Sequence, residues 1–196
     1  MRSILTRLCF TLVGLGLASS GMAALSASAT MTSTQTGPDT WHYDLTLDNT
    51  GTTQIGTFWF SWVPGGDLMA SPASNISSPI YWTGVDTNLG AGDGHAVEWT
   101  VLPGYPYALN PADVVSGFGF DSSVPPSAFA GKSPIFSTLA LTTSYVYIGQ
   151  AFGTPTAPDS GAVFDAVPPA PTPEPASLGI FGLGAGLLLM RRHRSK

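Results

Sequence analysis

Glycine and proline are so frequent in residues 30–166 that a helix of ordinary length has no room there. The chain holds 23 Gly and 17 Pro among 196 residues. No stretch of eleven or more residues in this part keeps a helical period while free of both. Both residue types weaken helices and favour turns. This part of the chain, called the body below, is therefore expected to form short strands joined by turns.

Several segments of the body alternate between apolar and polar residues, as half-buried strands do. Residues 41–48 alternate in this way, and residues 139–148 have the composition of a strand. A strand over 53–63 is expected to place Phe58, Phe60 and Trp62 on one face and Thr57, Trp59 and Ser61 on the other. Two further rows are expected to face one side each: Val97, Trp99 and Val101, and Val114, Ser116, Phe118 and Phe120. Together these strands predict an all-β fold, an antiparallel β-sandwich.

The N-terminal residues have the three parts of a secretory signal peptide. Two arginines precede an apolar run over 8–17, and small residues then lead to Ala27-Ser28-Ala29. Cleavage is expected after Ala29, with Ala23 as the alternative site, and export through the Sec translocon follows. A permanent anchor is not expected, since ten helical residues cover about 15 Å of a roughly 30 Å hydrocarbon core.

The C-terminal residues combine a stiff spacer, a short apolar segment and a basic cluster. Residues 168–175 contain five prolines, which favour an extended polyproline conformation. Residues 176–190 are uncharged, and Arg191, Arg192 and Arg194 follow them. Fifteen residues form a helix of about 22 Å, which is short for a permanent span. The arginines hold this end in the cytoplasm, so the body is expected outside and its membrane attachment temporary.

This tail resembles the PEP-CTERM sorting signal of Gram-negative bacteria, through Pro173-Glu174-Pro175, the apolar helix and the arginine cluster. The resemblance implies recognition by an exosortase-type membrane enzyme, removal of the tail, and delivery to the cell surface or exopolysaccharide matrix. The same kind of tail is also called an ice-binding protein C-terminal domain, a label that gives no activity. An ordinary tail anchor is the alternative. More weakly, residues 43–51 resemble the opening hairpin of immunoglobulin-like bacterial surface domains.

The expected organisation therefore has five parts. A signal peptide (1–29) precedes the β-sandwich body (30–166), which is immunoglobulin-like if the weaker resemblance holds. A Pro-rich linker with the sorting motif (167–175), a transmembrane helix (176–190) and a basic cytoplasmic tail (191–196) follow. The only cysteine, Cys9, would be removed with the signal peptide, so neither disulfides nor thiolate chemistry are expected in the mature chain.

The charge of the body excludes nucleic acid as a partner. Between residues 30 and 172 the chain has one basic residue, Lys132, and eleven Asp and Glu, which gives a formal charge of −10. Nucleic-acid binding depends on Lys and Arg that neutralise phosphates. Cations, neutral glycans and basic partners remain compatible with this charge.

Candidate chemical sites are few. Asp86, Asn88 and Asp93 lie in a Gly-rich segment and are weak calcium candidates, since calcium prefers several oxygen ligands on a flexible turn. A plain turn uses the same residue types, and the EF-hand pattern is not met. No cofactor is therefore expected, with calcium as the alternative.

Two histidines are the only acid–base candidates near neutral pH, His42 beside Asp44 and His95 near Glu98. No Gly-x-Ser-x-Gly nucleophile elbow occurs, and no pair of carboxylates is marked for glycoside hydrolysis. No catalytic residue is assigned, and the protein is not expected to be an enzyme.

Nine Trp and Tyr lie between residues 41 and 107, and flat rings on a sandwich face can stack sugars. Trp59 is the candidate glycan contact, because it points away from Phe58 and Phe60. Alternating threonines at 30, 32, 34 and 36 are expected in a disordered terminus. The sequence thus predicts an exported, non-enzymatic structural or adhesive protein of the surface, biofilm or extracellular matrix. A carbohydrate-binding module is the alternative, and a secreted hydrolase the third.

Overall fold

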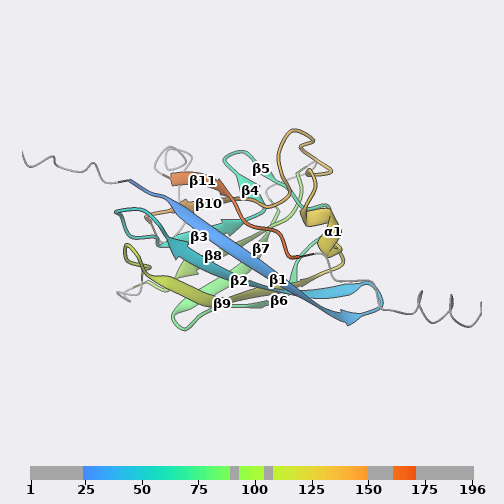
Figure 1. Ribbon diagram of the computed structural model, residues 1–196, viewed down its shortest axis with the longest axis horizontal. Coiled ribbons are helices and arrows are strands. Elements are labelled where there is room, and N and C mark those ends of the chain that lie inside the picture. The colour runs from blue at the N-terminus through green and yellow to red at the C-terminus, as the bar shows by residue number, and fades with distance from the viewer. Residues whose placement is uncertain (1–23, 89–92, 104–107, 150–160, 171–196) are drawn as a thin grey trace, which may run out of the picture.

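A computed structural model describes residues 24–88, 93–103, 108–149 and 161–170 (Figure 1). The described part is all-β, as predicted, with one helical turn, α1 (Pro126–Phe129). No helix in it is long and apolar enough to cross a membrane. Cys9, the sorting residues Pro173, Glu174 and Pro175, the expected helix 176–190, and the cluster of Arg191, Arg192 and Arg194 all lie outside these residues.

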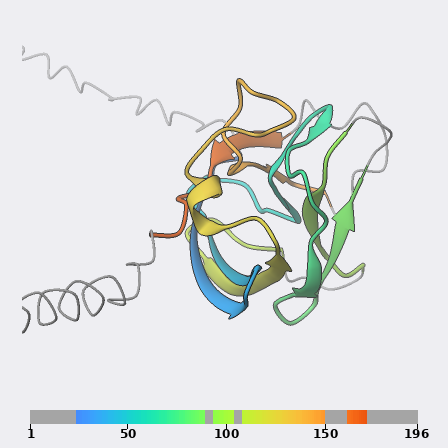
Figure 2. The ribbon, with the colours of Figure 1, turned by 90° about the vertical axis from the view of Figure 1, so that its right-hand side faces the viewer.

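Two antiparallel sheets pack face to face, one on each side of the core (Figure 2). The first sheet has the order β1 (Ala27–Gly37), β2 (Thr40–Asn49), β9 (Val114–Ser122) and β6 (Ser74–Ser77). The second has the order β11 (Gly161–Asp165), β10 (Thr143–Tyr147), β3 (Thr57–Phe60), β8 (Ala96–Val101) and β7 (Trp82–Thr87). A small ribbon pairs β4 (Trp62–Val63) with β5 (Gly66–Asp67). The predicted β-sandwich is confirmed.

Strand β2 shows how alternation sets the inner and outer faces. Tyr43, Leu45 and Leu47 are fully buried, while the residues between them lie on the outer face. The Tyr43 hydroxyl donates a hydrogen bond to the carbonyl oxygen of Val124, and burial raises the pKa of this tyrosine. This buried hydroxyl is therefore paired, as a polar group in an apolar core must be.

The strand expected over 53–63 is interrupted at Ser61. This serine has a φ of 60°, in the left-handed region, and it separates β3 from β4. Its side chain donates a buried hydrogen bond of 2.8 Å to the carbonyl oxygen of Leu141. The break changes the face of the next residue, so Trp62 packs on Trp59 rather than beside Phe60. The predicted placement of Trp62 is wrong for this reason.

The row expected at 114–120 is likewise divided by a bulge. Thr46 pairs with Ser116 and Leu45 with Phe118, so Gly117 is the additional residue of β9. Its φ of 97° is one that side chains rarely adopt. Val114 and Ser116 before the bulge therefore face solvent, whereas Phe118 and Phe120 after it are fully buried.

Strand β1 corrects two expectations about the N-terminal part of the body. It is an ordered strand over its whole length, so the expected disorder of the threonine row is wrong. Ala29 is buried, pairs with Leu47, and accepts a hydrogen bond of 2.8 Å from the backbone N–H of Val167. Upstream, Ala24 exchanges two hydrogen bonds of 2.9 Å with Thr52. The folded body thus extends six residues before the expected boundary at residue 30.

These contacts favour Ala23 over Ala29 as the signal-peptide cleavage site. Cleavage after Ala29 would remove the first three residues of β1 and the bonds of Ala24, whereas cleavage after Ala23 preserves both. We expect the exported protein to begin at Ala24, as read by N-terminal sequencing and intact mass. Ala23→Phe should block this cleavage, because a small residue is needed there, and Ala24→Phe serves as control. A mature chain beginning at Thr30 would contradict the expectation.

Candidate functional site

The outer face of the second sheet carries an aromatic cluster, formed by Trp59, Trp62 and Tyr145 together with Ala96. Trp59 is only 3% exposed, and its ring centroid lies 4.6 Å from that of Trp62. Tyr145 packs edge-on against Trp62. Trp59 is therefore buried on the face away from the main core, and the prediction that it is an accessible glycan contact is wrong.

Glu98 lies beside this cluster, between Trp59 of β3 and Val85 of β7 in the strand register. Burial raises the pKa of its carboxyl group to about 7, although a hydrogen bond from Thr100 partly opposes the shift. The apolar surroundings disfavour the charged form. A carboxyl group with this pKa can exchange protons near neutral pH. It is not paired with His95 as the sequence proximity suggested, because His95 bonds Asp86.

His42 is the centre of a charged group on the outer face of the first sheet. Its Nδ1 lies 2.6 Å from Asp121, and its Nε2 lies 3.4 Å from Asp44. The hydrogen bond with Asp121 raises the pKa of His42. Hydrogen bonds from Asn75 and His42 lower the pKa of Asp121. The expectation that His42 and Asp44 share a face is confirmed, and both ring nitrogens face carboxylates.

The calcium candidates bond mainly to groups of the protein. Both oxygens of Asp86 are engaged, one with His95 at 2.9 Å and the other with the backbone N–H of Ala73 at 2.8 Å. One carboxylate oxygen of Asp93 accepts hydrogen bonds from the backbone N–H groups of Asp67 and Gly94. Asn88 lies 3.4 Å from His95. Within the described ranges no group of three or more His, Cys, Asp or Glu could hold a metal, and the intervening residues 89–92 fall outside them.

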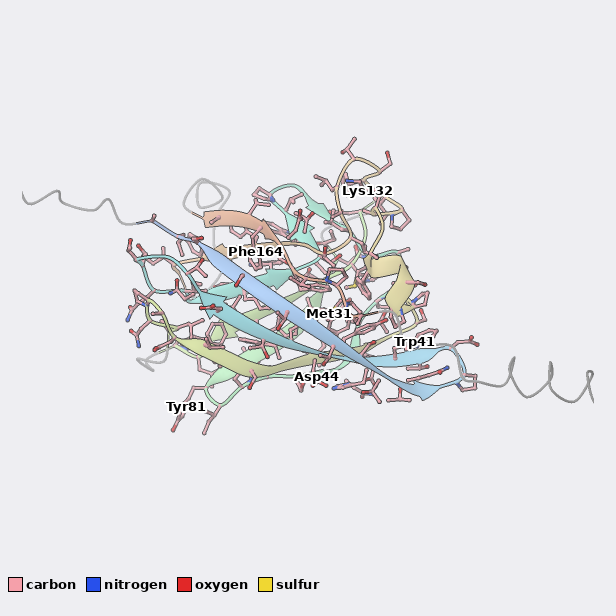
Figure 3. All side chains as sticks on the ribbon, in the orientation of Figure 1. Met31, Trp41, Asp44, Tyr81, Lys132 and Phe164 are labelled. Atoms are coloured by element: carbon pink, nitrogen blue, oxygen red, sulfur yellow. The ribbon has the colours of Figure 1, made fainter. Side chains whose placement is uncertain are left out.

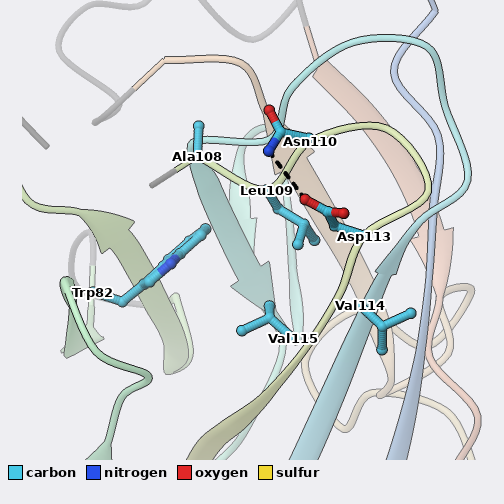
Figure 4. Close-up of a pocket in the computed structure, with 7 residues that line it drawn as sticks. All are labelled: Trp82, Ala108, Leu109, Asn110, Asp113, Val114 and Val115. Atoms are coloured by element: carbon cyan, nitrogen blue, oxygen red, sulfur yellow. Dashed lines mark hydrogen bonds between the residues drawn. The ribbon is translucent and has the colours of Figure 1, made fainter. Parts of the chain in front are cut away.

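A pocket of about 270 Å³ opens between the two sheets at one end of the sandwich. The first residue of β7, Trp82, forms one side, and the first residues of β9 form another (Figure 4). The loop before β9 closes it with Ala108, Leu109, Asn110 and Asp113. No sequence pattern predicted this pocket. Its only local signals are a tryptophan and an Asn-Pro turn, and about thirty residues separate Trp82 from the loop.

The C-terminal tail matches a known protein-sorting motif. The pattern described as the PEP-CTERM protein-sorting motif matches residues 171–194. The chain carries a PEP-CTERM sorting motif. This match confirms the resemblance of the tail, and a PEP-CTERM motif indicates an exported protein that an exosortase processes and sorts to the cell surface. No curated protein matches the chain.

Three solved structures illustrate what the body of the chain is similar to. The chitin-binding domain of Chi18aC from Streptomyces coelicolor is 28% identical, with 51% of this chain and 82% of that domain covered and a TM-score of 0.33. A CBM3 of Hungateiclostridium clariflavum is 13% identical over 67% of this chain and 99% of its own, with a TM-score of 0.39. A GH20 exo β-N-acetylglucosaminidase of Vibrio harveyi is 10% identical, with 76% of this chain and 19% of that enzyme covered and a TM-score of 0.42.

Because Trp59 is part of a buried cluster, its truncation should act on stability. We expect Trp59→Ala to lower the free energy of unfolding by about 3–5 kcal/mol, the usual range for truncating a buried aromatic side chain. Urea denaturation followed by circular dichroism measures it. Ile80→Ala, at a position that is 78% exposed, is the control and should change stability by less than about 0.5 kcal/mol. An unchanged stability in Trp59→Ala would refute the burial.

Glu98 should make the stability depend on pH. Its folded pKa of about 7 exceeds the reference value of 4.5, so the unfolded chain releases this proton first as the pH rises. Wild type should lose up to about 3 kcal/mol relative to Glu98→Gln between pH 4.5 and 7, and little more above. Denaturation of both proteins at pH 4.5, 6 and 8 measures the difference. The exposed Asp39→Asn is the control; a pH-independent difference for Glu98→Gln would contradict the assignment.

Proposed function

We propose that the protein is a non-enzymatic structural or adhesive component of the cell surface or exopolysaccharide matrix. The observation that carries the proposal is the PEP-CTERM motif at residues 171–194 attached to a folded β-sandwich. A Sec-type signal peptide, an exosortase-type enzyme and removal of residues 176–196 belong to the same proposal. Residues 176–190 hold the chain in the membrane until that removal.

The surface of the body suits a hydrated matrix. The outer face of the first sheet presents small polar side chains in register, for example Thr30, Thr46 and Ser116 across three strands. Figure 3 shows Asp44 on this strand face and Lys132, the only Lys or Arg in the described part, on a separate loop. Such a face favours hydration over apolar association. This surface is compatible with contact to a neutral polysaccharide, whereas its negative charge disfavours the binding of anionic polymers.

The surroundings of His42 and Glu98 support a non-enzymatic role. Both nitrogens of His42 face carboxylates rather than a hydroxyl nucleophile. Glu98 is an acid of suitable pKa, but it lies on a strand face beside Trp59 and outside the pocket at Trp82. A general acid needs a substrate within hydrogen-bond reach. A carbohydrate-binding module is the second candidate, favoured by the amphipathic lining of that pocket.

Processing of the tail can be tested by the mass and location of the product. In a Gram-negative host with an exosortase, we expect the full chain in the surface or matrix fraction without Met190 and the residues after it. Without the exosortase it should remain in the inner membrane at full tail length. A variant lacking residues 172–196 should be exported but not held in that membrane. Fractionation followed by intact mass spectrometry measures all three.

Replacing Arg191, Arg192 and Arg194 by Gln should weaken retention and processing, because positive charges fix the cytoplasmic end. A double replacement of Arg2 and Arg7 controls for general export defects. A native product from exosortase-containing cells that still carries Met190 would overturn the proposal.

A further inference from the structure

The pocket at Trp82 is held in place by a buried asparagine. Asn49 is fully buried, and its side-chain amide donates a hydrogen bond of 2.9 Å to the carbonyl oxygen of Leu109. The backbone carbonyl oxygen of Asn49 accepts a hydrogen bond from the N–H of Ala112, and its backbone N–H donates one to the carbonyl oxygen of Asp113. Leu109 also forms a two-bond bridge with Ile55. These bonds fix the loop that forms the wall of the pocket, so the site is formed before any ligand binds.

The polar side chains of the pocket are oriented by one another. Asn110 accepts a hydrogen bond of 2.6 Å from Gln54 and donates one of 3.0 Å to Oδ2 of Asp113, as Figure 4 shows for the second. The other carboxylate oxygen, Oδ1, has no hydrogen-bond donor among the described residues. The carboxylate thus presents a free acceptor, and the amide beside it keeps a second N–H.

The apolar side of the pocket is an indole ring. Trp82 is 7% exposed and packs edge-on against Phe118, with the ring centroids 5.2 Å apart. Its indole N–H makes no hydrogen bond to any described residue. Leu109 and Val115 complete the apolar lining. The pocket therefore combines a fixed ring, aliphatic groups, a carboxylate acceptor and amide donors.

We propose that this pocket binds a single neutral sugar residue of a matrix polysaccharide. A sugar has hydroxyl groups for Asp113 and Asn110. Its apolar C–H groups can contact Val115 and the small exposed part of Trp82. The volume of about 270 Å³ lies just below the range of ordinary ligand sites, which begins at roughly 300 Å³, and suits one sugar residue rather than a longer ligand. Asp113 and the formal charge of −10 on the body disfavour uronic acids. A divalent cation would need more oxygen ligands than the pocket lining offers.

The assignment rests on the proposed function, because only an exported body meets that polysaccharide. The test uses the full chain in detergent, titrated calorimetrically with cellotetraose, chitotetraose, mannotetraose and tetragalacturonate. We expect saturable binding of at least one neutral tetrasaccharide and none of the galacturonate. Asp113→Asn should weaken the neutral ligand at least about tenfold, since the charged acceptor is lost. Asp39→Asn, at an exposed turn residue, should leave the affinity unchanged.

A second pair of variants tests the pocket by filling it. Val114 lines the pocket and is 62% exposed, while Val163 on β11 is 52% exposed and lies outside the lining. Val114→Phe should abolish binding, and Val163→Phe should not. Circular dichroism verifies that each variant is folded.

Three results would overturn the assignment: no neutral tetrasaccharide binds, galacturonate binds preferentially, or the pocket and control variants behave alike. These failures are distinct from failure of the proposed function. A correctly processed surface protein that binds none of these sugars removes the pocket assignment alone. A sugar-binding chain that keeps its tail in the membrane removes the proposed function alone.

Discussion

Aromatic packing between the two sheets is the interaction on which the structure depends. Residues 24–170 contain no cysteine, so no disulfide can join the sheets. Phe58 of the second sheet meets Phe118 of the first edge-on at 5.4 Å between centroids, and Phe60 lies 5.5 Å from Phe120. Large rings bury much area and set the spacing of a sandwich core. The stability of the exported body thus comes from its core.

The same packing determines where a ligand can bind. Strand β3 is buried on both faces, so Trp59 serves the fold, and Glu98 beside it is kept from full solvation. Rings on these strands are therefore largely unavailable to a sugar. At one end of the sandwich Trp82 borders a pocket. The proposed sugar site therefore lies at an end of the sandwich rather than on a strand face, because loops supply polar groups there.

The sequence predicted well those features that depend on local alternation. Strand β2 and the row of Val97, Trp99 and Val101 face the core as expected, because one face of each is buried and the period of two is preserved. The predictions were wrong where a break or a bulge changes which side chains face the core. Ser61 adopts a positive φ without a sequence signal for it, and the bulge at Gly117 shows only as one of many glycines. Burial of Trp59 depends on Tyr145, far away in the sequence, which alternation cannot reveal.

The position of β1 explains how both ends of the chain can be removed without loss of the fold. Its residues Ala29 and Met31 bond to Val167, so the first strand and the last described segment lie together. The sorting motif begins at residue 171, beyond these bonds, and the prolines that follow Val167 lack the N–H needed to extend the pairing. Loss of residues 171–196 therefore leaves the bonds between β1 and Val167 in place, and a signal-peptide cleavage after Ala23 leaves them in place as well. Cleavage after Ala29 would remove the hydrogen bond between Ala29 and Val167. The two cleavage sites therefore differ in their consequences for the folded body.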